Sequence, residues 1–535
     1  MSETTNIDNT AHASVTVESG SLSGFNTPKG TRSFLGIPYA APPVEELRWR
    51  PPQRPLAWTG VRSAEKFGPS SIQSPPPSRS LYGGGITDFS EDCLYLNVYT
   101  GPEGAEALPV LVWFHFGAFL FGSASDPLCD GTNLAAEGVT VVTVNYRLGR
   151  FGFLAHAELS AESGHQSSGN YGIMDQIAAL EWIQRNIQAF GGDAKNVTIG
   201  GVSAGGESVH ILRSSPRAKS LFTKAICESG PGMAPPIDGP GHVAAYMSLH
   251  AAEKAGAELL QSVGAGSIAE LRKMPAEKIA GAQLPREKGP WKSRLWPGTA
   301  SLSIFDTVNP IVDGYVLPES PLTAFMSSKV ADVPLLAGNV VNEGTALPYL
   351  SSLGQYDAHV NEAFTEHTDE VRRLYPATTD SEVEAITINL LEDQVFIWPT
   401  WTAARLQAKN LRSPAWYSKF TRIPPIPHDA GAVEKSWAGS FHCANAVYAF
   451  GNIDVWRWDW TQADRGLSRD MLEAYVHFVR IGDPNGIDQD HDGIWPALES
   501  SSGLIKIWDV DPRLEEPSSR SSDVSTFWDS YYGVE

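Results

Sequence analysis

Short apolar runs recur along the chain, separated by segments with helical periodicity. Residues 108–115 (Leu-Pro-Val-Leu-Val-Trp-Phe-His) are apolar at almost every position. A run of this length without polar alternation is typical of a strand buried on both faces of a sheet. The same pattern predicts further strands at Val139–Asn145, Val197–Gly201, Pro334–Ala337, Ala415–Phe420 and Leu504–Ile507.

Helical patterns lie between these strands. Apolar positions recur at helical spacing over Asp175–Ala189, Val243–Val263 and Arg469–Arg480. The run Ser267-Ile268-Ala269-Glu270 is a capping box that begins another helix. Because strands alternate with helices, we expect an α/β fold with a mostly parallel central sheet and helices on both faces.

Charge and composition narrow the classes of function. Lys plus Arg is 40 and Asp plus Glu is 61, so the net charge is -21. Such a chain repels phosphate backbones, and we expect no nucleic-acid partner. Four cysteines exclude a disulfide-dense scaffold. The most apolar run, residues 108–122, is shorter than the ~20 residues of a membrane span. The polar N-terminus lacks the pattern of a secretory signal. These features predict a cytoplasmic protein without a membrane span.

A serine in a glycine-rich turn is the first candidate for catalysis. Gly201-Val202-Ser203-Ala204-Gly205 matches the pattern G-x-S-x-G, directly after the strand that contains Val197. Residues 206–212 can begin a helix. A serine on such a strand-to-helix turn exposes its Oγ at the top of the sheet, as a nucleophile requires. The alternative is a glycine-rich turn that contains an incidental serine.

In this context the sequence resembles the type-B carboxylesterase and cholinesterase-like family of the α/β-hydrolase superfamily. The motifs that carry the resemblance are spread over residues 14–530: Phe34–Pro43, Glu91–Val98, Asn145–Gly149, Gly169–Gly172, Phe190–Gly205, Pro310–Gly314, Gly482–Gly486 and Trp495-Pro496. The resemblance implies an α/β-hydrolase fold with helical insertions over the active site. It also implies ester hydrolysis through an acyl-enzyme, without a cofactor.

The general base and its acid partner are identified by the resemblance. Nine of the 13 histidines follow Ser203, and residue order alone leaves them all open. The run Gly439–His442 resembles the family's histidine loop and selects His442. The run Gly338–Gly344 follows a predicted strand and resembles the acid loop, which makes Glu343 the acid and Asp313 the runner-up. The alternative for Glu343 is a surface carboxylate.

These three catalytic candidates bear on the number of domains. At ~150 residues per domain, 535 residues suggest three or four domains. Ser203, Glu343 and His442 must nevertheless meet in one site. We therefore expect a flexible tail at residues 1–13 and one hydrolase domain at residues 14–535.

The oxyanion hole departs from the family pattern. One N–H should come from Ala204, the residue after the nucleophile. The family carries His-Gly-Gly-Gly in a loop after an early strand, where this chain has His115-Phe116-Gly117-Ala118. Matching positions make Gly117 and Ala118 the other donors. Phe116 either narrows the acyl pocket or packs under the loop, and the sequence does not choose between these.

Two further departures concern substrate and redox state. Val202 stands where the family often has Glu, so the site lacks that carboxylate. Residues 71–93 also lack the Trp that cholinesterases of the family place against a quaternary ammonium group. Both features argue against a cationic choline ester. Ser71 stands where the family has a disulfide-bonded cysteine, so Cys93 lacks its partner. This absence favours a reducing compartment.

The substrate is expected to be a bulky, apolar carboxylic ester. Several aromatic residues are candidates to line its site, although core packing explains them equally well: Trp291, Trp296, Phe396, Trp398 and Trp401. We name Val202, Phe116 and Trp398 as candidate substrate contacts. An acyltransferase with the same triad is the alternative function. A catalytically inactive adhesion protein is a weaker alternative, because all three triad candidates are present. The expected partner is a small-molecule ester, and the protein is expected to be a monomer or homodimer.

A possible calcium motif lies near the C-terminus. Asp488–Gly493 followed by Glu499 fits the EF-hand loop pattern. Pro496 interrupts that loop, and a Ser-rich stretch replaces the exit helix. We therefore expect a solvated acidic loop and no metal.

Overall fold

The computed structural model describes residues 12–73, 81–82, 86–236, 246–282, 289–293, 309–426, 438–487, 494–499 and 503–534. Most of the expected tail, Trp296 and Asp488–Gly493 of the calcium motif lie outside the described residues.

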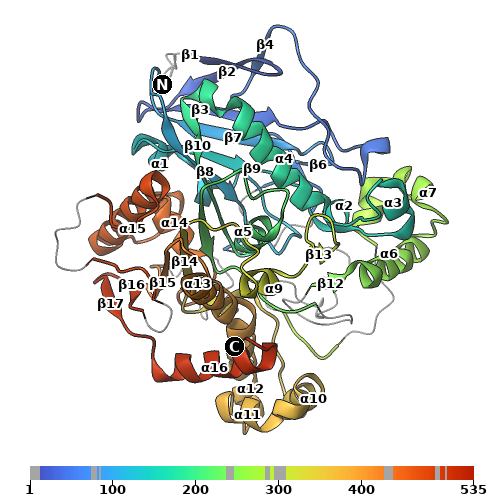
Figure 1. The fold of residues 1–535 in the computed structure, drawn as a ribbon, viewed down its shortest axis with the longest axis vertical. Coiled ribbons are helices and arrows are strands. Elements are labelled where there is room, and N and C mark those ends of the chain that lie inside the picture. Colours follow the sequence, from blue (N-terminus) through green and yellow to red (C-terminus); the bar gives the residue numbers. More distant parts are fainter. Residues whose placement is uncertain are drawn as a thin grey trace, which may run out of the picture.

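A large mixed sheet organises the chain (Figure 1). Its strands lie in the order β1-β2-β3-β7-β9-β8-β10-β11-β14-β15-β16-β17, and β4 pairs with β2. From β9 to β16 all neighbouring strands are parallel. The strands are β1 (His12–Val17), β2 (Gly20–Asn26), β3 (Arg32–Pro38), β4 (Val61–Ser63), β7 (Tyr95–Thr100), β8 (Leu108–Phe114), β9 (Thr140–Val144), β10 (Gly192–Val202), β11 (Lys224–Glu228), β14 (Leu335–Val340), β15 (Ala415–Phe420), β16 (Ile505–Trp508) and β17 (Arg513–Glu515).

Two short parallel pairs lie outside this sheet. They are β5 (Ser70–Ser71) with β6 (Phe89–Ser90), and β12 (Met247–Ser248) with β13 (Ile311–Val312). The α-helices are α1 (Thr132–Ala136), α2 (Gly149–Phe153), α3 (Ala157–Glu162), α4 (Tyr171–Asn186), α5 (Ala204–Ser214), α6 (Leu249–Val263), α7 (Ile268–Arg272), α8 (Ala276–Ala280), α9 (Pro321–Met326), α10 (Leu353–Ala363), α11 (Thr368–Leu374), α12 (Asp380–Glu392), α13 (Trp398–Asn410), α14 (Ala444–Ala449), α15 (Gln462–Ile481) and α16 (Ser519–Tyr532). A π-helical segment, Asp393–Ile397, joins α12 to α13.

Side chains of the central strands point alternately into two separate cores. On β8, Val110 and Val112 belong to a core that also contains Leu180 of α4 and Val209 of α5. The intervening Leu111 and Trp113 belong to a second core with α14 and α15. Because successive side chains of a strand face opposite sides, a strand covered by helices on both sides must be apolar throughout. The predicted α/β fold with a mostly parallel sheet is therefore confirmed.

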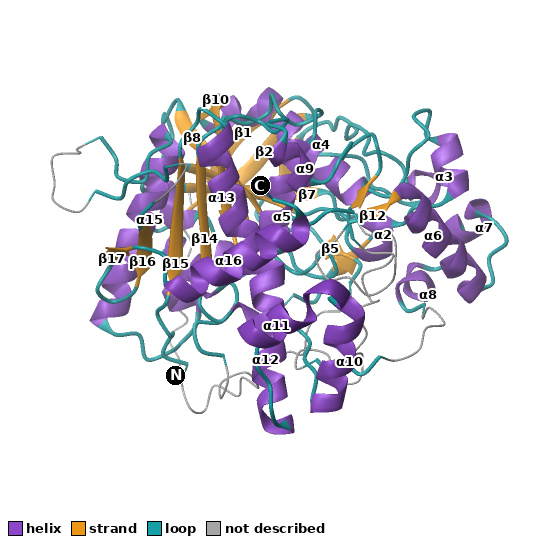
Figure 2. Cartoon of the chain, turned by 60° about the horizontal axis from the view of Figure 1, so that its bottom comes forward, coloured by secondary structure: helices purple, strands orange, loops and turns teal. Residues whose placement is uncertain are grey.

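A third core holds the helices between β14 and β15 together with the C-terminal helix. It contains Val360 of α10, Val383 of α12, Trp398 of α13 and Trp528 of α16. Figure 1 shows α10, α11 and α12 at one end of the molecule, near α16. Helix α13 lies against β14 and β15 (Figure 2). This helical layer follows directly on the loop that contains Glu343.

The predicted elements agree with the structure apart from their ends. Strand β14 extends to Val340, three residues beyond the prediction. Helix α15 begins at Gln462 because Thr461 and Asp464 form a capping box ahead of the apolar positions. Helix α6 begins at Leu249, where the Ser248 hydroxyl accepts a hydrogen bond from the N–H of Ala251. The expected cap is present at Ser267, which accepts from the N–H of Glu270.

Two observations concern membrane-spanning helices and disulfide bonds. Among the described residues, no helix combines the length and apolar character needed to cross a bilayer. Cys93, Cys129, Cys227 and Cys443 are all buried and unpaired. Ser71 uses its hydroxyl to accept a hydrogen bond of 3.0 Å from the N–H of Leu148.

Candidate active site

Ser203 occupies a strained turn between β10 and α5. Its φ of 59° and ψ of -124° lie outside the regions that L-residues favour. The turn is tight enough that a Cβ at position 201 would lie 2.4 Å from backbone atoms of Gly205. The geometry of a nucleophile elbow is therefore present where the G-x-S-x-G motif predicts it.

Backbone hydrogen bonds hold this turn in place. The N–H of Ser203 donates to the carbonyl oxygen of Glu228 on β11 (3.0 Å), and its carbonyl oxygen accepts from the N–H of Glu207 (2.9 Å). The Ser203 residue is 8% exposed. It precedes the first turn of α5, whose N-terminal dipole favours negative charge developing nearby.

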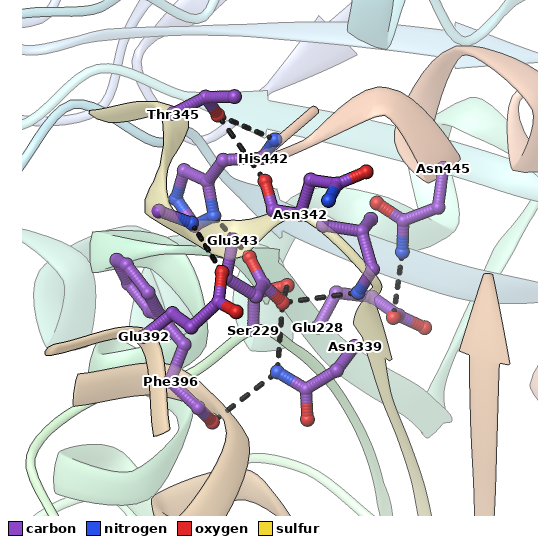
Figure 3. Close-up of polar contacts among 12 residues, drawn as sticks. Glu228, Ser229, Asn339, Asn342, Glu343, Thr345, Glu392, Phe396, His442 and Asn445 are labelled. Atoms are coloured by element: carbon purple, nitrogen blue, oxygen red, sulfur yellow. Dashed lines mark hydrogen bonds and ion pairs between the residues drawn. The ribbon is translucent and has the colours of Figure 1, made fainter. Parts of the chain in front are cut away.

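Glu343 and His442 form a buried pair at the same end of the sheet (Figure 3). Glu343 begins a short 3₁₀ helix, Glu343–Ala346, after β14, and His442 lies in the loop after β15. The distance from Glu343 Oε2 to His442 Nδ1 is 2.5 Å. A carboxylate in this position accepts from a protonated Nδ1, which leaves Nε2 free to take a proton.

The second oxygen of Glu343 is also fully used. Oε1 accepts hydrogen bonds from the hydroxyl of Ser229 (2.6 Å), Nδ2 of Asn339 (2.8 Å) and the N–H of Val340 (3.0 Å). Figure 3 shows the carboxylate between His442 on one side and Ser229 and Asn339 on the other. These donors fix the plane of the carboxylate and thereby the orientation of the imidazole.

The imidazole of His442 is held from several directions. Its backbone N–H donates to Oγ1 of Thr345 (3.0 Å), and the ring of Phe396 lies 4.3 Å from the imidazole centroid. Its Nε2 atom is buried and has no hydrogen-bond partner within the described residues. The structure records no hydrogen bond between Ser203 and His442. Catalytic hydrogen bonds are often long before substrate binds.

Glu228 links the elbow to the histidine loop. Its backbone carbonyl accepts from Ser203, and its Oε2 accepts from Nδ2 of Asn445, three residues after His442. The hydroxyl of Tyr475 donates to its Oε1 (2.6 Å). Burial raises the pKa of Glu228 to about 7. Sequence reasoning missed this residue, because a Glu at the end of a short strand carries no motif.

Glu392 is a half-buried carboxyl that sequence reasoning also missed. Its Oε2 accepts from the N–H of Gly344 (2.9 Å), directly after Glu343. Burial, followed by the nearby charge of Asp393, raises the pKa of Glu392 to about 8. The side chain is therefore mostly protonated at neutral pH.

The loop after β8 places the candidate oxyanion donors. Gly117 has a φ of 121°, and a Cβ there would lie 2.0 Å from the carbonyl oxygen of Phe121, so the position requires glycine. Ala118 has a φ of 51°. Within the described residues, the structure records no hydrogen bond from the N–H of Gly117, Ala118 or Ala204. Gly205 packs against the end of β8, just before this loop, since a Cβ there would lie 2.0 Å from the Phe114 oxygen.

The candidate substrate contacts lie in different surroundings. Phe116 is 3% exposed and packs edge-on against Tyr82 and Phe121, with ring centroids 6.1 and 6.2 Å away. Val202 is fully buried in the second core. Trp398 is buried in α13, and its Nε1 donates to Asp529 (2.8 Å).

The other aromatic candidates are also packed into the protein. Phe396 lies against His442, as described above, and Trp291 packs against His359 in the third core. Asp313, the runner-up acid, accepts hydrogen bonds from three backbone N–H groups of its own turn. It also accepts from Ser167. Within the described part of the chain, no group of three His, Cys, Asp or Glu residues could hold a metal.

Comparisons with known proteins show the family to which the chain belongs. The sequence pattern of the Carboxylesterase family matches residues 11–517. The fumonisin B1 esterase of Sphingopyxis macrogoltabida is 36% identical over 91% of this chain and 85% of its own length. The para-nitrobenzyl esterase of Bacillus subtilis is 33% identical over 94% of this chain and 96% of its own length.

Solved structures show the same likeness. A PNB esterase structure superposes with a TM-score of 0.78 at 32% identity, covering 96% of this chain and all of that one. A thermophilic PNB esterase gives a TM-score of 0.79 at 31% identity over 96% of this chain. The chain therefore belongs to the carboxylesterase family, has the α/β-hydrolase fold and is a carboxylic ester hydrolase.

Proposed function

We propose that Ser203, His442 and Glu343 form the catalytic triad of this esterase. The observation that carries the proposal is the 2.5 Å contact between Glu343 and Nδ1 of His442, together with the buried Nε2, which has no hydrogen-bond partner in the described part of the chain. An imidazole held in this way can accept the proton of a serine hydroxyl at its Nε2 atom. The elbow geometry of Ser203 supports its role as the nucleophile.

In the proposed mechanism, Oγ of Ser203 attacks the ester carbonyl carbon while its proton passes to Nε2 of His442. The tetrahedral intermediate collapses, and the imidazolium returns the proton to the departing alcohol. Water then attacks the acyl-enzyme with His442 as base, and the carboxylic acid leaves. Throughout, Glu343 stabilises the imidazolium.

The N–H groups of Gly117, Ala118 and Ala204 are the proposed oxyanion hole. Among the residues that the structure describes, these N–H groups have no other partner, which supports the assignment, because donors already satisfied by the protein would have to break bonds to serve the oxyanion. Ala118 also has a positive φ of 51°, which is strained for alanine. Such a conformation persists only where the surrounding structure imposes it, and it is common at active sites.

We propose a bulky, apolar ester as the substrate. Two relatives are named for fumonisin B1 and for para-nitrobenzyl esters. Val202 adds no negative charge beside the proposed nucleophile. The site therefore favours an apolar substrate group over a cationic one.

The test compares Ser203→Ala with Ser214→Ala on nitrophenyl esters of graded acyl length. Ser214 is a matched control because it is another buried serine, on α5, whose hydroxyl donates to the carbonyl oxygen of His210. We expect Ser203→Ala to lower kcat by on the order of 10³-fold or more without changing the melting temperature. Ser214→Ala should stay within a few-fold of wild type. Wild-type turnover by Ser203→Ala would refute the triad.

A further inference from the structure

A cavity of about 260 Å³ lies behind the catalytic acid, between the helical layer and the last parallel strands. Its walls come from α12, α13, β15, β16 and α16. Val341, two residues before Glu343, reaches it from the end of β14. The volume is close to the lower end of ligand pockets, which begin at ~300 Å³.

The cavity is separated from the imidazole by the π-helical segment. Ile397 lines the cavity, whereas the preceding Phe396 places its ring against His442. Glu392 lines the cavity and also holds the N–H of Gly344. Figure 3 shows Glu392 and Phe396 beside Glu343 and His442. The cavity is thus distinct from the proposed triad but shares its supporting residues. π-Helical turns are often found at functional sites.

The apolar part of the wall is held rigidly. The indole of Trp398 is fixed by its hydrogen bond to Asp529 and lies 4.9 Å from the ring of Tyr532. Trp401 packs edge-on against Tyr417 at 4.9 Å. Rings held in this way offer a preformed apolar surface. A ligand that binds there loses little affinity to the entropy cost of ordering these side chains.

The polar part of the wall holds two basic side chains, Arg520 and Lys419, and two acidic ones, Asp393 and Glu392. Arg520 faces Asp393 at 3.8 Å, and Asp393 also accepts from the hydroxyl of Tyr375 (2.9 Å). Glu392 is mostly protonated at neutral pH, as its raised pKa of about 8 indicates. The charge of Lys419 acts on both Glu392 and Asp393 and lowers their pKa values against the effect of burial. Its side chain makes no direct hydrogen bond or ion pair within the described residues. The Lys419 ammonium therefore interacts with these carboxyls at a distance and is available for a direct ion pair with an anionic ligand in a partly apolar cavity.

We propose that this cavity binds a monocarboxylate with an aromatic or branched apolar body, whose carboxylate pairs with Lys419 and whose body packs against Trp398 and Trp401. A cation is disfavoured by the charge of Lys419. A small inorganic anion would leave the aromatic walls without contacts. A monocarboxylate of this type is also the acid released from a bulky, apolar ester.

The same residues connect the cavity to the catalytic acid. The hydroxyl of Tyr417, in the cavity wall, donates to Oδ1 of Asn339 (2.8 Å). Nδ2 of Asn339 in turn donates to Glu343. A ligand that moves Tyr417 or Glu392 therefore alters the support of Glu343. Occupation of the cavity lowers turnover without blocking substrate binding, a consequence that rests on the proposed function.

Binding is tested by isothermal titration calorimetry at pH 7 with 3-phenylpropionate on wild type, Lys419→Met and Lys506→Met. Lys506 is the matched control because it lies opposite Ser418 on the adjacent strand, so its side chain faces away from that of Lys419. We expect wild type and Lys506→Met to bind alike, and Lys419→Met to bind about tenfold more weakly. Equal affinity of all three proteins would show that Lys419 does not pair with the carboxylate and would overturn the proposed site.

Two further probes test the ligand class. Acetate has the same carboxylate without the apolar body and should bind at least about tenfold more weakly. Phenethylamine reverses the charge and should show no measurable binding. Acetate binding as tightly as 3-phenylpropionate, or an amine that binds equally well, contradicts the proposal.

The coupling is tested by steady-state kinetics with 3-phenylpropionate as inhibitor. We expect kcat to fall with KM little changed in wild type and Lys506→Met, and this effect to be lost in Lys419→Met. Competitive inhibition that is the same in all three proteins places the acid in the catalytic pocket and refutes the coupling. If Ser203→Ala shows the proposed triad to be wrong, the calorimetric result still decides whether the cavity binds carboxylates.

Discussion

Ser229 donates a hydrogen bond of 2.6 Å to Oε1 of Glu343, the carboxylate oxygen that does not contact His442. Ser229 has a φ of 48°, in the left-handed region that a non-glycine residue rarely adopts. The residue before it, Glu228, accepts the N–H of Ser203. The end of β11 therefore contacts both the proposed nucleophile and the proposed acid, and the strain at Ser229 is retained where it positions Glu343.

Replacing Ser229 by Ala should lower kcat by about tenfold and leave KM nearly unchanged. The hydrogen bond to a charged acceptor orients Glu343, and such bonds contribute ~1.5–3 kcal/mol. Steady-state kinetics and a melting curve measure the two effects separately, with Ser214→Ala as the buried-serine control. A variant that melts earlier but retains its kcat shows that Ser229 supports the fold only.

Glu343→Gln should lower kcat by on the order of 10³–10⁴-fold, because an amide can present its NH₂ group to His442 and favour the wrong tautomer. The matched control is Glu392→Gln, since its amide oxygen still accepts from the N–H of Gly344. This control should stay within a few-fold of wild type. Similar losses in both variants would indicate a general electrostatic disturbance rather than a specific role of Glu343.

Much of the parallel sheet could be predicted because its strands are apolar on both faces. Residues 415–420 were predicted as a strand with the bounds that the structure shows. Strand β11 was missed, since Lys224 and Glu228 flank only three apolar residues. Both charged ends are buried, and residues far away in the sequence supply hydrogen bonds to them, as Tyr475 does for Glu228. Sequence periodicity carries no information about such partners.

The same limit applies to the candidate site. The elbow of Ser203 is a local feature, and a five-residue pattern predicts it. The pairing of Glu343 with His442 depends on two loops that follow different strands, and family resemblance was needed to select them. Ser229 and Asn339 could not be found at all, because their role arises only when β11 and β14 lie side by side.

Phe116 is expected to serve packing rather than acyl selection. It is buried between the rings of Tyr82 and Phe121, so Phe116→Ala should destabilise the protein by about 3–5 kcal/mol. Phe116→Leu, which retains most of the volume, should cost less and leave the preference among acyl chain lengths unchanged. Denaturation curves and a series of nitrophenyl esters measure these effects. A changed acyl preference in Phe116→Leu would instead place the ring in the substrate pocket.

The buried carboxyl of Glu228 should make stability depend on pH. Its pKa rises from 4.5 to about 7 on folding, chiefly because burial disfavours the charged form. Between these values the folded protein binds more protons than the unfolded chain, so raising the pH destabilises the fold. The shift corresponds to about 3 kcal/mol lost by pH 8 relative to pH 4.

Glu228→Gln removes this titration while keeping an amide oxygen that can accept from Asn445. The unfolding free energy of the variant relative to wild type should therefore increase as pH rises from 5 to 8. Urea unfolding of both proteins at each pH measures this difference, and the other buried carboxyls cancel in it. A difference independent of pH would mean that Glu228 remains ionised in the folded protein throughout this range, with Tyr475 and Asn445 stabilising its charge.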